Sequence, residues 1–199
     1  MRGMEEMGFI SIFGNSKYIN ICTDSLVYGE DNQRFDDYEK IYRLDDTHVM
    51  TYTGTAADME KVKKDASEQL QVATSYEEWL KEVTDGVAKI PYKNEREKIM
   101  VCLIGKMPNG LRMSSFSNNP DDQLDDLKLT DKGLKYMLLA NFDDEAGTVV
   151  GQLSDSIKKY TDKSMKSRDV MLAQKELAQF VAITKPDNAN ASLQTLTFK

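Results

Sequence analysis

Few side chains in this 199-residue sequence combine a reactive group with the spacing that chemistry requires. The two cysteines, Cys22 and Cys102, each lie inside a strand-like apolar run, where a thiol more often acts as a small hydrophobic group than as a nucleophile or metal ligand. The single histidine, His48, opens a strand after a turn and has no second histidine or cysteine at metal-ligand spacing. We therefore expect two buried structural thiols, no metal site and no cofactor.

Acidic pairs are the other residues that could bind a ligand. Paired carboxylates can hold a divalent cation, but in polar stretches such as these we interpret them as solvated loop charge. The pairs are Asp36-Asp37, Asp121-Asp122 and Asp125-Asp126. The whole chain carries 26 Lys and Arg against 33 Asp and Glu, a net charge of −7, and its pI is about 4.9. That balance disfavours a nucleic-acid partner, because the phosphate backbone would be repelled.

Length and composition indicate how many domains the chain forms and which environment it suits. A chain of 199 residues, 40% hydrophobic and 30% charged, is typical of one globular domain spanning residues 1–199. No apolar run approaches the roughly 18 residues of a membrane span, so no membrane partner is expected. No signal peptide precedes the cysteines, which favours a reduced, cytoplasmic setting.

The first half of the chain changes from strand patterns to helix patterns. Apolar and β-branched runs around turn residues predict two hairpins, 8–13 with 18–23 and 40–44 with 48–53. Apolar residues then recur every three or four positions, which predicts amphipathic helices. One begins at Thr55 and runs to Leu70, and the other begins at Ser75 and ends before Pro91. Each start resembles a capping box, with an acidic residue three positions after the Ser or Thr.

The second half repeats this order. The predicted strands are 99–104, 111–116 and 135–140, with an Asp-rich loop before the last of them. Helical spacing returns at 149–160, a shorter helix is expected over 168–177, and 180–184 with 193–198 are expected to close the chain as strands. Strands and helices grouped in blocks predict an α+β protein, in which helix pairs cover two antiparallel sheets.

Three short runs give a more specific indication. Ile21-Cys-Thr-Asp-Ser25, Glu39-Lys-Ile-Tyr-Arg-Leu44 and Thr53-Gly-Thr-Ala-Ala-Asp58 together resemble the amino-terminal third of proteasome β-subunits and of the bacterial HslV peptidase. In that family an aspartate precedes a lysine by sixteen residues, and Asp24 precedes Lys40 by the same number. The resemblance implies the N-terminal nucleophile hydrolase fold, a four-layer αββα sandwich of two antiparallel sheets.

The resemblance also implies a role for each matching residue. In the family, a threonine hydroxyl is the nucleophile, and its own α-amine serves as general base after a propeptide is removed. Lys40 takes the position of the lysine that lowers the proton affinity of the nucleophile, and Asp24 that of the aspartate that holds this lysine. Gly54 takes the position of the amide that stabilises the oxyanion. Asp24 and Lys40 are equally compatible with a structural ion pair, and Gly54 with a positive backbone angle before a helix.

The position of the nucleophile is where this chain departs from the family. Counting back sixteen residues from Asp24 reaches Gly8, and glycine has no hydroxyl or thiol. We therefore expect the opening strand to place Gly8 beside the ammonium group of Lys40, with an open space where a hydroxyl would lie. Residues 1–7 would be an N-terminal extension. The resulting hypothesis is a pseudo-peptidase that acts in assembly or binding.

Two alternatives stay open at this point. The chain could be an active amide or peptide hydrolase with a displaced nucleophile such as Ser11, three residues further along the same strand; Cys22 is mid-strand and fits that role less well. It could also be an interaction module with this topology by convergence, for which its 11 methionines would suit a protein partner. Under the family hypothesis a homo-oligomeric ring or barrel, or another protein partner, is expected. The segment 139–144 also departs from the family, because it lacks the Gly-Ser-Gly that the resemblance implies after the later strand.

Overall fold

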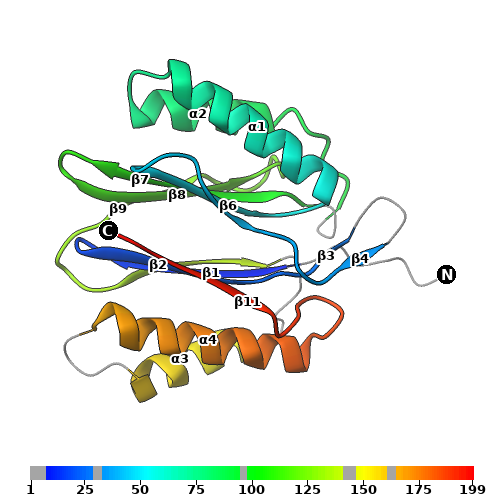
Figure 1. The fold of residues 1–199 in the computed structure, drawn as a ribbon, viewed down its shortest axis with the longest axis vertical. Helices are drawn as coiled ribbons and strands as arrows, with labels where there is room; N and C mark the ends of the chain where they lie inside the picture. The colour runs from blue at the N-terminus through cyan, green and yellow to red at the C-terminus, as the bar shows by residue number, and fades with distance from the viewer. Residues whose placement is uncertain (1–7, 29–32, 95–97, 141–146, 161–164) are drawn as a thin grey trace.

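The computed structural model describes residues 8–28, 33–94, 98–140, 147–160 and 165–199, so the predicted extension at residues 1–7 lies outside it. Figure 1 shows four layers, with α1 and α2 over one sheet, a second sheet beneath it, and α3 and α4 below. Helices occupy only the two outer layers, and the strands pair antiparallel in both sheets. The chain is therefore an α+β sandwich, as the grouping of strands and helices predicted.

The sheet next to α3 and α4 has four strands within the described residues. In spatial order they are β10 (Lys135–Ala140), β1 (Phe9–Asn15), β2 (Tyr18–Asp24) and β11 (Leu193–Phe198). Side chains alternate along β1, so that Ile10 and Ile12 pack towards the other sheet while Phe9 and Phe13 pack towards the helices. Both faces are covered, which explains why β1 and β2 are almost continuously apolar.

The sheet under α1 and α2 has five strands within the described residues. They are β5 (Ile41–Arg43), β6 (His48–Thr53), β7 (Met100–Met107), β8 (Gly110–Ser117) and β9 (Asp125–Lys128). A small hairpin of β3 (Val27–Tyr28) and β4 (Arg34–Phe35) precedes them. The interpretation of 125–126 as loop charge was wrong, because β9 is an edge strand whose acidic residues face solvent or pair with Arg112.

Helices α1 (Ala56–Val72) and α2 (Tyr76–Val87) begin at the predicted caps. Thr55 Oγ1 accepts a hydrogen bond from the Asp58 amide at 3.1 Å, and Ser75 Oγ accepts one from the Glu78 amide at 3.1 Å. Each cap satisfies a backbone amide that has no partner within the helix. The short turn between the helices folds α2 back beside α1, and their apolar faces both pack on the five-stranded sheet.

Helices α3 (Thr148–Tyr160) and α4 (Ser167–Thr184) form the opposite layer. The strand predicted at 180–184 was wrong, because α4 continues through it. Val170, Leu177 and Val181 all face the sheet, so the helical spacing extends past the point where the β-branched composition indicated a strand. In the described part of the chain, no helix is long and apolar enough to span a membrane.

Three apolar clusters fill the spaces between the four layers. One lies between α1, α2 and their sheet and contains the buried Trp79, the second lies between the two sheets, and the third lies between the four-stranded sheet and α3 and α4. Each of the inner spaces is a packed core rather than a gap. Polar groups buried at the end of the space between the two sheets therefore need partners, and this is where the candidate site lies.

Candidate functional site

Asp24 and Lys40 form an ion pair in the protein interior. Lys40 Nζ donates to Asp24 Oδ1 at 3.0 Å, and both residues are buried. Asp24 ends β2 and Lys40 directly precedes β5, so the pair joins the two sheets. Removing two charges from water is unfavourable unless they are paired and hydrogen-bonded, which is the arrangement found here.

The carboxylate of Asp24 also binds two backbone amides. Phe9 N donates to Oδ1 at 2.7 Å, and Leu26 N donates to Oδ2 at 2.8 Å. These contacts fix the start of β1 and the turn after β2 against the lysine. One carboxylate thus orders three chain segments, and each of its oxygens accepts at least one hydrogen bond.

Gly8 lies directly against the ammonium group of Lys40. A Cβ atom added to Gly8 would be 2.6 Å from Lys40 Nζ and 3.6 Å from the methyl group of Thr53. The structure therefore brings Gly8, Asp24 and Lys40 together. At the expected position of the nucleophile, a Cβ atom would meet the lysine ammonium, so a side chain at position 8 would require Lys40 Nζ to shift.

Gly54 lies one residue beyond Thr53, at the junction of β6 and α1. Its φ is +139°, in the region that favours glycine, and an added Cβ would lie 3.2 Å from a side-chain carbon of Ile99. The residue is therefore required for the sharp entry into α1, immediately before the Thr55 cap. This backbone role accounts for the glycine without any role for its amide in stabilising an oxyanion.

Burial controls the electrostatics of the pair. Desolvation lowers the pKa of Lys40 below its ordinary value of 10.5, and the neighbouring charge and hydrogen bond of Asp24 offset only part of that effect. The fold thus disfavours the charged form of the lysine, compared with the same group in the unfolded chain.

This shift predicts how stability depends on pH. Between the depressed pKa of folded Lys40 and 10.5, the unfolded chain binds more protons than the folded one. The free energy of unfolding should therefore rise with pH in that window, by up to about 1.4 kcal/mol per pH unit for this group. Urea unfolding of the native protein and of Lys40→Met, over about pH 8 to 10, measures the difference in slope. A native slope equal to or below that of Lys40→Met would contradict the prediction.

The backbone around Lys40 is held by residues from the far end of the chain. The Lys40 amide donates to Gln194 Oε1 at 2.9 Å, and Gln194 Nε2 donates to the Tyr38 carbonyl at 2.6 Å. Asn190 similarly accepts from the Ser25 amide at 3.1 Å. No spacing in the sequence could indicate Gln194 or Asn190, because 154 residues separate Gln194 from Lys40 and 165 separate Asn190 from Ser25.

The other candidate nucleophiles lie elsewhere. Ser11 Oγ is fully buried, donates to the Cys22 carbonyl at 3.3 Å and accepts from Gln174 of α4 at 3.2 Å. Alternation along β1 places Ser11 on the helix-facing side of the sheet, whereas Gly8 faces Lys40. Cys22 and Cys102 are free and buried, and burial raises the pKa of the Cys22 thiol to about 12, which leaves little reactive thiolate.

The candidate metal ligands make ordinary polar contacts. His48 Nδ1 is 3.0 Å from a carboxylate oxygen of Asp45, and its ring meets the edge of Trp79. Asp36 pairs with Arg34 and Asp126 with Arg112. Among the residues that the structure describes, no group of three or more His, Cys, Asp or Glu side chains is arranged to hold a metal ion.

Taken together, the site contains a buried cation, its carboxylate partner and a glycine, with no hydroxyl or thiol at position 8. Such an arrangement can fix backbone geometry and exclude water, but Gly8 itself cannot form an acyl intermediate. In the segment 139–144, where the sequence lacks the family's Gly-Ser-Gly, residues 139 and 140 end β10, and residues 141–144 lie outside the described residues. No protein-family model matches this sequence, and no curated protein matches it.

Proposed function

We propose that this chain is a non-catalytic protein with the N-terminal nucleophile hydrolase fold, related to proteasome β-subunits and HslV, and that it acts in assembly or binding. The observation that carries the proposal is the position of Lys40 Nζ, which lies 2.6 Å from where a Cβ of residue 8 would be. The lysine that would activate a nucleophile instead fills the space of the nucleophile. The four-layer architecture and the joining of the sheets by Asp24 and Lys40 are consistent with this relationship.

An active hydrolase with a displaced nucleophile is the alternative. Ser11 would need to approach Lys40, but its hydroxyl faces Gln174 on the other side of the sheet. The two neighbouring strands β2 and β10 pair with β1 on either side, so rotation of Ser11 would break both ladders. We therefore favour the non-catalytic function.

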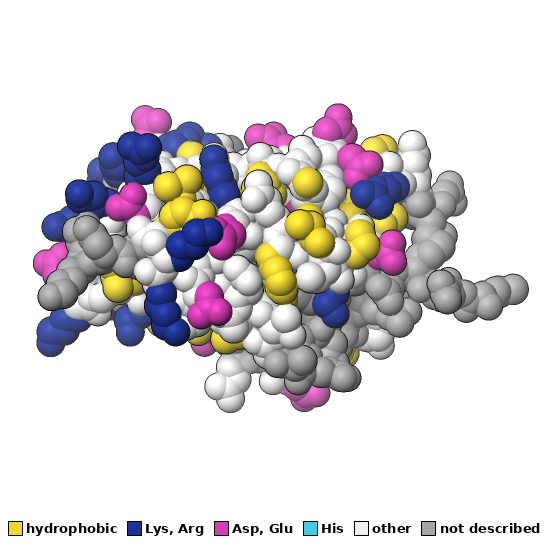
Figure 2. Space-filling view, turned by 90° about the horizontal axis from the view of Figure 1, so that it is seen from below, with side chains coloured by type: hydrophobic (Ala, Val, Ile, Leu, Met, Phe, Trp, Pro, Cys, Tyr) yellow, Lys and Arg dark blue, Asp and Glu magenta, His cyan; other side chains and the backbone are white. Residues whose placement is uncertain are grey.

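A homo-oligomer in the cytoplasm belongs to the same proposal. The face formed by α3 and α4 carries exposed apolar side chains, and Figure 2 shows apolar groups on this side of the molecule. They include Val150, Leu172 and Ile183, of which Ile183 is 79% exposed. Exposed apolar side chains of this size are suited to burial against another protein. The two buried, unpaired cysteines support a reducing compartment.

The test combines an activity assay with a measurement of mass. We expect the purified protein to show no hydrolysis of fluorogenic peptides and no covalent adduct with threonine-directed electrophiles by intact mass spectrometry. Light scattering should give the mass of an oligomer of two or more chains of 22.6 kDa. Hydrolysis that is lost in Ser11→Ala but kept in the matched exposed-serine variant Ser192→Ala would support the displaced nucleophile instead. A monomer without activity would remove the assembly role.

A further inference from the structure

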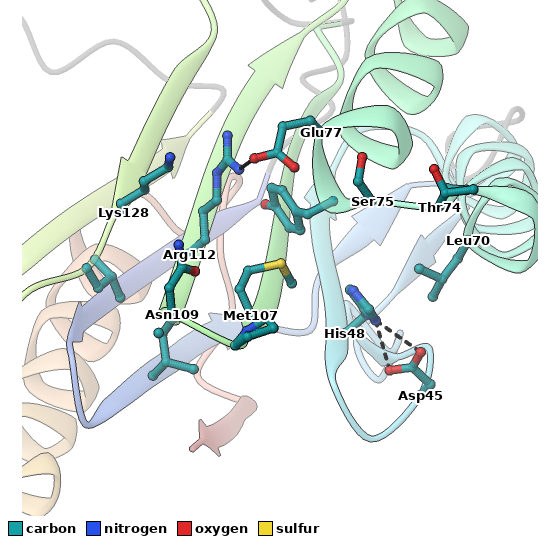
Figure 3. A pocket seen from close by; sticks show the side chains of 16 residues that line it. Asp45, His48, Leu70, Thr74, Ser75, Glu77, Met107, Asn109, Arg112 and Lys128 are labelled. Carbon is teal, nitrogen blue, oxygen red and sulfur yellow. Dashed lines mark hydrogen bonds and ion pairs between the residues drawn. The ribbon is translucent and has the colours of Figure 1, made fainter.

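A pocket lies at the opposite end of the five-stranded sheet from Gly8 and Lys40. It has a volume of about 620 Å³ and lies between the β7–β8 turn, the β5–β6 turn and the start of α2. Figure 3 shows Arg112, Lys128 and Glu77 at one end of this pocket and His48 with Asp45 at the other. A volume of this size is typical of sites for small organic molecules.

Two cations face each other across neighbouring strands at one end of the pocket. Arg112 of β8 and Lys128 of β9 are direct partners in the antiparallel register, so both side chains lie on the same face of the sheet. Like charges directly opposite one another are destabilising unless an anion lies between or beside them. Asp126 and Glu77 supply such anions here, so the charges at this end of the pocket are balanced while Glu77 stays in place.

The guanidinium of Arg112 is held by Asp126 along one edge, and the ring of Tyr76 packs against it. Asp126 accepts from Arg112 Nε at 2.7 Å, and the ring of Tyr76 lies 4.7 Å from the guanidinium carbon. Arg112 Nη1 donates to Glu77, whose side chain is 63% exposed while that of Arg112 is 8% exposed. A buried, oriented guanidinium whose outer partner is an exposed carboxylate can exchange that carboxylate for an anionic ligand.

The remaining walls suit an apolar group beside the anion. Leu70, Tyr76 and Met107 line the pocket and belong to the apolar cluster under α1 and α2. The pocket therefore combines an apolar wall with an end at which Arg112 and Lys128 lie beside the exposed carboxylate of Glu77.

We propose that this pocket binds a small organic anion, with its acidic group between Arg112 and Lys128 and its apolar part against Leu70, Tyr76 and Met107. Binding would displace the carboxylate of Glu77 from the guanidinium. The proposal does not depend on whether the Gly8 site is catalytic, because none of the residues lining this pocket belongs to that site.

The probe for this site is 8-anilinonaphthalene-1-sulfonate, an aromatic body that carries one anionic group. Fluorescence titration should show binding at one site, and the neutral analogue N-phenyl-1-naphthylamine should bind about tenfold more weakly. Lys128→Glu should weaken binding of the sulfonate by about tenfold, because it places a negative charge beside the acidic group. Glu77→Gln should strengthen binding severalfold, because it removes the competing carboxylate.

Matched variants separate this pocket from general surface charge. Lys158→Glu makes the same charge change at an exposed residue of α3, and Glu82→Gln removes a carboxylate from α2 outside the pocket. Neither should alter the affinity for the sulfonate. Equal affinity for the two probes, a Lys128→Glu effect no larger than that of Lys158→Glu, or no gain in Glu77→Gln would each overturn the proposal.

Discussion

Replacement of Asp24 by alanine is expected to lower the free energy of unfolding by about 3–5 kcal/mol. The variant leaves the fully buried Lys40 without its counter-ion and leaves the Phe9 and Leu26 amides without their acceptor. Removing one partner of a buried pair is costly because the other charge stays desolvated, and the pKa of Lys40 falls further once Asp24 no longer raises it. Equilibrium unfolding in urea, followed by far-UV circular dichroism, measures the loss.

An exposed pair provides the control for this experiment. Asp85 accepts from Lys81 at 2.7 Å on the outer surface of α2, and both side chains are more than half exposed. Asp85→Ala should lower the free energy of unfolding far less than Asp24→Ala does, because solvent screens an exposed pair. The double variant Asp24→Leu/Lys40→Met, which leaves no unpaired charge, should be more stable than Asp24→Ala. If Asp24→Ala and Asp85→Ala proved equally stable, the interior pair would not hold the two sheets together.

Much of the fold could be predicted because local patterns and tertiary packing agree along most of the chain. Thr55 and Ser75 cap the helices whose apolar faces they introduce, and the turn residues at 14–17 and 108–110 join strands that pair directly. Where composition and spacing disagreed, the spacing was the better guide. The residues 180–184 are rich in β-branched side chains, yet Val181 continues the sheet-facing row of α4.

The acidic strand β9 was missed for a different reason. Asp125 and Asp126 have low strand propensity, and their place at the sheet edge depends on Arg112, fourteen positions away from Asp126. A pattern read along one segment contains no information about a partner strand. The same limit applies to Gln194 and Asn190, which hold the segments around Lys40 and Ser25 from the end of the chain.

The candidate site shows both what spacing can indicate and what it cannot. Sixteen residues separate Gly8 from Asp24 and Asp24 from Lys40, and these three residues meet in the structure. Spacing gives the neighbours of a position but not the conformation of a long side chain beside it. The absence of a Cβ at Gly8 allows the Lys40 ammonium to lie where a nucleophile would be, which could not be inferred before the packing was known.

Restoring a threonine at position 8 is therefore expected to destabilise the protein and to leave it inactive. Gly8→Thr places a Cβ 2.6 Å from Lys40 Nζ, so the lysine must move away from Asp24 or the start of β1 must shift. Overpacking of this kind lowers the free energy of unfolding by about 1–3 kcal/mol. Urea unfolding measures the loss, and intact mass spectrometry after incubation with a threonine-directed electrophile should show no adduct.

Gly86 supplies the matched control, since a Cβ at this helical position has nothing within 4 Å. Gly86→Ala should stabilise the protein by about 0.5–1 kcal/mol, because alanine restricts the unfolded chain more than glycine does. Opposite signs for the two glycine variants would show that the cost at position 8 comes from the lysine and not from the loss of glycine itself. If Gly8→Thr instead kept full stability and formed the adduct, Lys40 would withdraw easily, and the site would lack only its hydroxyl.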